Sequence, residues 1–229
     1  MAEHGGPSMV AENYLASMYR MAEEGETVTV GKLADMLRRS PPSERLGLAL
    51  PSVLGMLRRL VKDGLVEISG DKSVEPTARG KQLGETVVRR HRLAERLLAD
   101  VLHVELTQVH TEAHKLEHAL SDEVTSNIND LLGQPRTCPF GYPIPGNGAS
   151  KRHPRTLAQV AEGEQWIVDR VREEDSRLLA YLIANDVLPG AAMVVQEIAP
   201  YKGTLTLLVN ERPVVIGLAV ASGIRVRRD

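Results

Sequence analysis

The chain has 229 residues, with 28 Lys and Arg against 30 Asp and Glu, a formal net charge of -2 and 42% hydrophobic residues. This ordinary balance excludes long disorder, and the length favours two or three small domains over one large domain. The single cysteine, Cys138, excludes a disulfide framework, and the lack of a signal peptide or of an apolar run of roughly 18 residues predicts a cytoplasmic protein without a membrane partner.

The N-terminal third of the chain has the pattern of three short helices. Apolar residues recur at three- and four-residue steps over residues 9–21 and 30–37, which predicts two amphipathic helices. A Pro- and Ser-rich break at residues 40–43 follows. A third helix is expected to begin near Pro51, which suits a first helical turn, and to end at Gly64.

A hairpin is predicted directly after the third helix. Residues 65–68 alternate as a strand, a Gly-Asp turn follows, and residues 73–75 return. Such a hairpin is the wing of a winged helix-turn-helix. We therefore expect a DNA-binding domain over residues 1–77.

The third predicted helix and the wing carry basic residues where DNA phosphates would lie. Winged helices also mediate protein contacts, and basic residues are often only solvated, but the wing and the local charge together favour DNA binding. Leu54, Gly55 and Met56 offer few hydrogen bonds to base edges, so we expect phosphate contacts and DNA shape to dominate. The candidate DNA-binding residues are Ser52, Arg58, Arg59, Lys62 and Lys72.

The middle of the chain is predicted to be helical, with helices over residues 78–101, 106–120 and 122–132. Five of the seven histidines lie between residues 91 and 118, within the first two of these helices and their connection. A segment rich in Pro and Gly, residues 133–153, follows as a loop and linker.

Two of these helices carry potential metal ligands at three- or four-residue spacing, which places them on one face of each helix. If the helices are antiparallel neighbours, imidazoles and carboxylates from both converge in the gap between them. The alternative is that each helix face is solvated and forms only ion pairs, but this does not explain why so many His and Glu residues are aligned on the two helices. The first helix contributes His91 and Glu95, and the second contributes His110, His114, Glu117 and His118.

The types of ligand narrow the choice of metal. Imidazoles, carboxylates and the amide oxygen of Asn13, without a thiolate, suit a borderline divalent ion such as Mn, Fe, Co, Ni or Zn. Calcium and copper(I) are poor matches.

The C-terminal part is predicted to be a small, mostly β module, with one helix over residues 176–184 between its first two strands. The strands are expected over residues 166–171, 192–198, 204–209 and 214–219. The expected divisions after the winged helix are a helical domain over residues 78–147, a linker over 148–160 and a β domain over 161–229.

Three segments, residues 90–98, 109–122 and 138–146, resemble the diphtheria toxin repressor family of metal-dependent transcriptional regulators, and the match covers nearly the whole chain. This family includes iron-dependent and manganese-dependent repressors. The resemblance implies an α+β protein with an N-terminal winged helix-turn-helix, a helical metal-binding and dimerisation domain, and a C-terminal SH3-like β-barrel.

The resemblance also divides the ligand candidates between two metal sites. The site often called ancillary would contain His91, Glu95 and His110. The regulatory site would contain Asn13, His114, Glu117 and His118. Iron regulators of the family usually have Cys at the position of His114 and Met at the position of Asn13. Manganese regulators usually have a carboxylate at each of these positions. This chain matches neither pattern, so the resemblance does not decide between Mn(II) and Fe(II) as the bound metal.

The function implied is a homodimeric repressor of metal-homeostasis genes, in which Mn(2+) or Fe(2+) acts as co-repressor for binding to a palindromic double-stranded DNA operator, with no enzymatic activity. The turn over residues 38–49 looks longer than that of the family, and Gly55 stands where members use Gln near DNA, so the operator sequence does not transfer.

A zinc metallopeptidase is the alternative. His114 to His118 fits the H-x-x-E-H pattern, in which Glu117 would be a general base. The metallopeptidase interpretation does not explain the wing or the His91/Glu95 pair.

Overall fold

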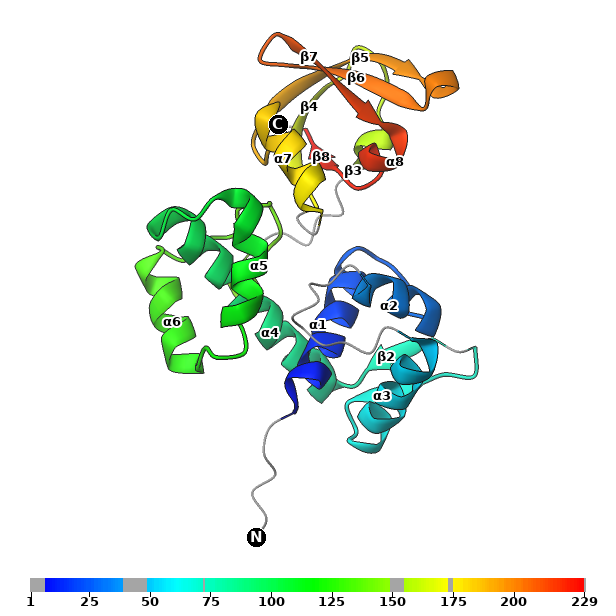
Figure 1. Cartoon of the computed structure of the whole chain (residues 1–229), viewed down its shortest axis with the longest axis vertical. Coiled ribbons are helices and arrows are strands. Elements are labelled where there is room, and N and C mark those ends of the chain that lie inside the picture. The colour runs from blue at the N-terminus through cyan, green and yellow to red at the C-terminus, as the bar shows by residue number, and fades with distance from the viewer. Residues whose placement is uncertain (1–6, 39–48, 72, 149–154, 173–174, 229) are drawn as a thin grey trace.

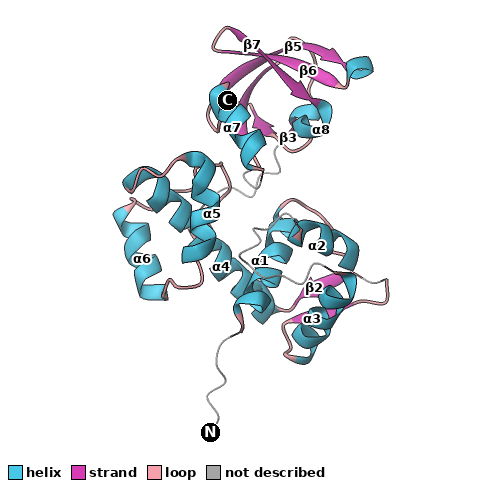
Figure 2. Cartoon of the chain, in the orientation of Figure 1, coloured by secondary structure: helices cyan, strands magenta, loops and turns pink. Residues whose placement is uncertain are grey.

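The computed structural model describes residues 7–38, 49–71, 73–148, 155–172 and 175–228. They form an N-terminal helical domain with a small hairpin, a second helical domain, and a C-terminal β domain (Figure 1). Within these residues, strands are confined to the hairpin and the C-terminal domain (Figure 2). The predicted α+β class and the order of the domains are confirmed.

The N-terminal domain is a winged helix. Its helices pack through faces in which buried apolar residues recur every three or four positions, as at Tyr14, Leu15 and Met18, so burial of these stripes stabilises the bundle. Each of the first two helices begins at a capping hydroxyl, Ser8 and Thr29, which accepts a backbone N–H from the first turn. The elements are α1 (Met9–Glu23), α2 (Val30–Leu37), α3 (Leu50–Lys62), β1 (Val66–Ile68) and β2 (Val74–Pro76).

The predicted wing is present. β1 and β2 pair antiparallel, with Ile68 opposite Val74. Asp71 closes the turn, since its Oδ1 accepts hydrogen bonds from the backbone N–H and the hydroxyl of Ser73 at 3.0 and 2.7 Å. Ser73 also forms a bridge with Thr29, which attaches the wing to the start of α2.

The helical domain differs from expectation at two helix ends. The predicted helix over residues 78–101 changes to π-helix after Arg96, where Leu102 N–H bonds to the Leu97 carbonyl. The predicted helix over residues 106–120 ends at Leu116, because Ser121 adopts an extended backbone and caps the next helix through Val124 N–H. The elements are α4 (Ala78–Arg96), η2 (Leu97–Val101), α5 (Leu106–Leu116) and α6 (Asp122–Leu131).

The two helical domains are joined by close packing of α1 on α4. Gly84 lies so near α1 that a Cβ there would come within 2.6 Å of the Leu15 carbonyl oxygen. Gly80 likewise faces the Leu65 carbonyl, at 1.9 Å from an added Cβ. Only glycine permits this approach, which brings the N-terminal end of α1 beside the helical domain.

The C-terminal domain is an SH3-like β domain, as predicted. Its sheet has the order β3-β8-β4-β5-β6-β7 with antiparallel pairs throughout, and bulges in β4 and β5 help it to curve. The strands are β3 (Arg155–Thr156), β4 (Gln165–Arg170), β5 (Ala192–Ala199), β6 (Thr204–Val209), β7 (Arg212–Gly217) and β8 (Arg225–Arg227). The helices are η3 (Leu157–Gln159), α7 (Ser176–Ala184), η4 (Pro200–Lys202) and α8 (Leu218–Ala221).

Two strands of this domain were missed in the sequence. Residues 155–160, expected within the linker, carry β3 and η3, and β3 pairs with β8 near the C-terminus. Both strands are too short to show a clear alternation of apolar and polar residues, so the sequence pattern does not predict them. They are formed by pairing between segments that are far apart in the chain.

The loop after α6 connects the helical and β domains. Phe140 is fully buried in a core that both domains share, and its carbonyl accepts the Val171 N–H at 3.1 Å. A Cβ on Gly141 would lie 1.9 Å from the Asp169 carbonyl oxygen, so glycine is required at this contact. None of the helices in the described residues combines the length and the apolar character needed to cross a bilayer.

Candidate metal centre

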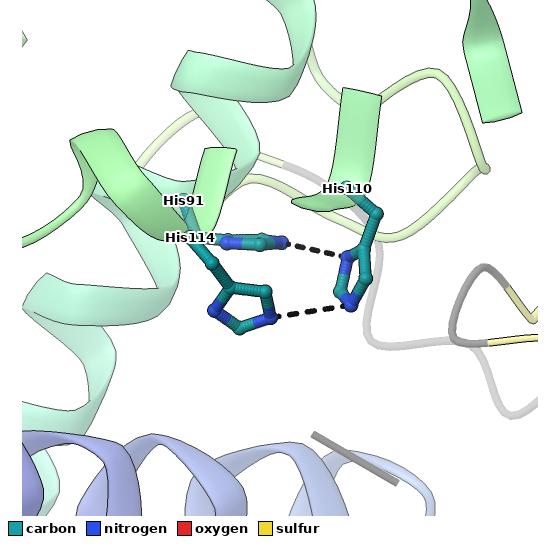
Figure 3. Close-up of side chains that lie close together, drawn as sticks. All are labelled: His91, His110 and His114. Atoms are coloured by element: carbon teal, nitrogen blue, oxygen red, sulfur yellow. Dashed lines mark hydrogen bonds between the residues drawn. The ribbon is translucent and has the colours of Figure 1, made fainter. Parts of the chain in front are cut away.

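Three imidazoles meet in the gap between α4 and α5. His91 comes from α4, and His110 and His114 come from successive turns of α5; one nitrogen of each lies within 4.8 Å of the others. His110 contacts both neighbours, with Nδ1 at 3.1 Å from His91 Nε2 and Nε2 at 3.2 Å from His114 Nε2 (Figure 3). All three side chains are buried. The helices therefore do bring these predicted residues together.

Two buried carboxylates complete the inner part of the cluster. Glu95 Oε1 lies 3.0 Å from His91 Nε2 and 3.2 Å from His110 Nδ1. Glu117 Oε2 lies 2.6 Å from His91 Nδ1, and its Oε1 lies 3.2 Å from His114 Nδ1. Glu95 and Glu117 are 0% and 1% exposed, so their charges depend on the imidazoles around them rather than on water.

The N-terminal domain reaches the cluster through α1. His118, two residues beyond the end of α5, places Nε2 at 2.8 Å from Asn13 Oδ1 and 3.1 Å from Glu117 Oε1. Its Nδ1 lies 2.6 Å from Glu12 Oε2. The cluster thus contains side chains of two domains.

The electrostatics of the cluster suit ligands for a cation. Burial lowers the pKa of His110 to about 3, so its imidazole is neutral at pH 7, which is the form that binds metal. Burial acts to raise the pKa values of Glu95 and Glu117, but the imidazoles beside them, His91 above all, hold both well below the usual range. Burial opposes charge on His118 too, yet hydrogen bonds to Glu117 and Glu12 raise its pKa to about 9. Its imidazole is therefore protonated at pH 7 without metal, and a bound ion would replace the proton at Nε2.

The donor set fits a divalent metal ion. Glu95 Oε2 is buried and has no hydrogen-bond partner among the described residues, although buried polar atoms are normally paired. Imidazole nitrogens and carboxylate oxygens are ligands for Mn, Fe, Co, Ni and Zn. Such an ion would also offset the two buried negative charges.

The two sites implied by the resemblance lie next to each other as one network in the structure. His91, expected in the ancillary site, contacts Glu117 of the regulatory site, and His110 contacts His114. The division into two ion positions therefore stays a prediction.

Glu12 is the residue of the cluster that the sequence reading missed. It belongs to the helix α1, from which only its neighbour Asn13 was predicted to be a ligand. Its proximity to Asn13 was the only signal in the sequence, because its partner His118 lies 106 positions further along the chain.

Four of the five predicted DNA-binding residues lie on the outer face of α3. Val53, Leu57 and Leu60 are buried against the domain core, so the opposite face is in solvent. The exposed residues on that face include Ser52, Arg58, Arg59 and Lys62. Lys72 and most of the long turn over residues 38–49 lie outside the described residues.

A winged helix linked through a buried imidazole and carboxylate cluster to a helical domain, with an SH3-like domain beyond it, is the architecture of a metal-responsive transcriptional regulator. Three family models match consecutive parts of the chain. They are "Iron dependent repressor, N-terminal DNA binding domain" at residues 8–74, "Iron dependent repressor, metal binding and dimerisation domain" at 77–146, and "FeoA domain" at 155–228.

Whole proteins give the same result. The iron-dependent repressor IdeR of Mycobacterium tuberculosis is 32% identical over 231 aligned positions, which cover 95% of this chain and 96% of IdeR. The diphtheria toxin repressor of Corynebacterium glutamicum is 39% identical over 60% of this chain and 56% of its own length. A solved structure of a manganese-dependent transcriptional repressor in complex with manganese aligns with a TM-score of 0.81 and 29% identity, over 95% of this chain and 99% of that one. The chain belongs to the diphtheria toxin repressor family of metal-dependent transcriptional regulators.

Proposed function

We propose that this chain is a homodimeric transcriptional repressor of metal-homeostasis genes, which binds a palindromic DNA operator when Mn(II) or Fe(II) occupies the cluster. One observation carries the proposal: His118 Nε2, just beyond the end of α5, lies 2.8 Å from Asn13 Oδ1 on α1. Because α1 belongs to the winged helix, occupancy of the cluster and the placement of α3 are linked.

The ligands of the proposed centre come from three helical segments. A bound divalent ion supplies positive charge beside Glu95 and Glu117, which are buried. The chain's own residues then keep α1 against α5, and this contact sets the spacing of the two α3 helices in the dimer to match successive major grooves. The residues that would hold the metal are Asn13, His91, Glu95, His110, His114, Glu117 and His118.

The homodimer is supported by apolar side chains that the helical domain leaves in solvent. Val124 and Leu131 lie seven residues apart on α6, so they share a face, and they are 45% and 67% exposed. Val101 and Leu102 at the end of η2 are 43% and 57% exposed. A second copy of this domain would bury such a surface, in agreement with the dimerisation domain that matches here.

We further propose Mn(II) as the physiological activator, with Fe(II) second. Every donor is nitrogen or oxygen, so the soft ligand that favours Fe(II) over harder ions is missing. Intrinsic affinity should still follow the usual order, with Mn(II) bound more weakly than Fe(II). We also propose that the protein acts in the cytoplasm, as the single cysteine leads us to expect.

The geometry disfavours the metallopeptidase. A general base needs an oxygen free to face a water molecule. Both oxygens of Glu117 instead contact imidazoles, from His91 on one side and from His114 and His118 on the other.

A DNA-binding titration tests the proposal. Fluorescence anisotropy on the region upstream of the protein's own operon should show specific binding with Mn(II) or Fe(II), under anaerobic conditions, and none with excess chelator. Equal binding with and without chelator would overturn the metal dependence. Activation by Fe(II) at its cellular free concentration, with none by Mn(II) at its own, would overturn the choice of Mn(II).

A further inference from the structure

The two nitrogens of His118 face different parts of the protein. Nε2 points into the cluster, at 2.8 Å from Asn13 Oδ1 and 3.1 Å from Glu117 Oε1. Nδ1 lies 2.6 Å from Glu12 Oε2, on the other side of the ring. The two nitrogens of an imidazole direct their bonds apart, so a group bonded at Nδ1 does not also bind an ion at Nε2.

We propose that Glu12 is a positioning residue for the metal centre, a role that rests on the proposed function of the cluster. Its carboxylate accepts the Nδ1–H of His118, which leaves Nε2 as the nitrogen that faces the ion. This hydrogen bond fixes both the tautomer and the orientation of the ring.

The charge of Glu12 has a particular use in this chain. Asn13 supplies a neutral oxygen, so among the described residues Glu117 is the one carboxylate in contact with Nε2 of His118. A carboxylate hydrogen-bonded to the far nitrogen makes the imidazole a more basic ligand. Glu12 therefore provides, through His118, part of the negative charge that Asn13 does not carry.

The position of Glu12 also matters for the response to metal. Glu12 lies in the first turn of α1, and its side chain is only 18% exposed because it packs against His118. The Glu12–His118 pair is therefore a second link between the winged helix and the helical domain, beside the Asn13 contact. We expect that loss of this link weakens metal binding and the attachment of α1 together.

Direct metal titration of the full-length protein, without DNA, tests the role. Mn(II) affinity is measured by competition with a fluorescent chelator for the wild type, Glu12→Ala, Glu12→Gln and the control Glu26→Gln, which removes the same charge from an exposed position of the same domain. Partner groups of this kind usually change affinity about 10- to 100-fold. We expect that loss for Glu12→Ala, a smaller loss for Glu12→Gln, whose amide oxygen still accepts a hydrogen bond, and no change for Glu26→Gln.

A spectroscopic readout separates positioning from a general structural effect. In the Zn(II)-loaded protein, ¹⁵N spectra of the imidazoles should show a slowly exchanging Nδ1–H on His118, and Glu12→Ala should lose it. If Glu12→Ala does not fold, Glu12→Gln decides alone. Wild-type affinity together with an unchanged His118 signal would overturn the role of Glu12.

The variant His118→Ala distinguishes failure of this role from failure of the metal centre. Normal Mn(II) binding by His118→Ala would show that His118 is not a ligand and would refute any metal site that contains it. Loss of binding in His118→Ala, with no change in the Glu12 variants, would refute only the role of Glu12.

Discussion

Glu117 contacts more imidazoles than any other carboxylate of the cluster, with His91, His114 and His118 within 3.2 Å of its oxygens. Its charge is therefore central both to the metal-free network and to a bound ion. A Gln side chain has nearly the same shape, but it offers one acceptor oxygen and no charge. Replacing Glu117 by Gln therefore removes the charge with little change in packing.

We predict that Glu117→Gln removes the stabilisation that metal confers. Ligand at about 100 times its Kd stabilises a folded protein by about 2.7 kcal/mol, which a calorimetric melt detects as a higher Tm. Wild-type protein should show this rise with Mn(II), and Glu117→Gln should show little of it and lose metal-dependent DNA binding, while size-exclusion chromatography still gives a dimer. Glu112→Gln is the control, since Glu112 lies in α5, which ends directly before Glu117, but pairs with Lys115. A Glu117→Gln protein with a normal response would contradict the site.

At the scale of elements, the contact between α1 and α4 decides where Glu12 and Asn13 lie. The contact requires glycine, because a Cβ at Gly84 would meet the Leu15 backbone oxygen at 2.6 Å, and backbone atoms yield less readily than side-chain ends. The metal centre therefore depends on a residue that carries no functional group.

We predict opposite effects for two glycine substitutions in helices. Gly84→Ala should destabilise by about 1–3 kcal/mol through overpacking, and it should weaken metal-dependent DNA binding by displacing α1. Gly55→Ala should stabilise by roughly 0.5–1 kcal/mol, because Gly55 is in α3 with no atom near an added Cβ. Chemical denaturation measures both. Equal stability of Gly84→Ala and wild type would show that the helices are less tightly packed than the structure indicates.

The exposed basic face of α3 allows a second prediction at this scale. Neutralising Arg58 or Lys62 with Gln should weaken specific and non-specific DNA binding alike and reduce the slope of log K against log salt by about one unit per lost phosphate contact. Arg212→Gln, at an exposed residue of β7 in the C-terminal domain, should leave the slope unchanged. A changed base preference with an intact slope would instead assign the residue to base recognition.

At the scale of the whole molecule, the far end of α1 is attached to the C-terminal domain. Directly after α1, the Glu24 carboxylate binds two arginines of the β domain, with Arg225 Nε at 2.9 Å and Arg170 Nη1 at 3.4 Å. Arg170 is almost fully buried, so water does not readily replace this partner. One helix thus contacts the metal cluster near its start and the β domain just beyond its end.

We predict that Glu24→Gln loosens the C-terminal domain. The charge that holds Arg170 and Arg225 is lost, so distances between spin labels on the N- and C-terminal domains should become more widely distributed in pulsed EPR. Glu26→Gln, two residues along and exposed, should leave the distribution unchanged. An unaltered distribution in Glu24→Gln would show that the core around Phe140 holds the domain without this ion pair.

The sequence by itself determined the order of the domains and most of the elements. The three- and four-residue recurrence of apolar residues located the helices of the winged helix. Segments rich in strand-forming residues located four strands of the β domain, although the last of them ends at Gly217, two residues earlier than predicted. The same spacing placed His91 with Glu95, and His110 with His114, on their helix faces. These are local properties, set by residues a few positions apart, so they can be read without the rest of the chain.

Only the tertiary structure decided which of these faces meet. β3 pairs with β8, and Glu12 contacts His118 across 106 positions. The local sequence of one segment does not predict its contact with the other in either case. The early end of α5 likewise follows from the cap that Ser121 forms for the next helix. Contacts of this kind depend on how whole helices and sheets pack, here on the close approach at Gly84, and packing is a property of the complete chain rather than of any single segment.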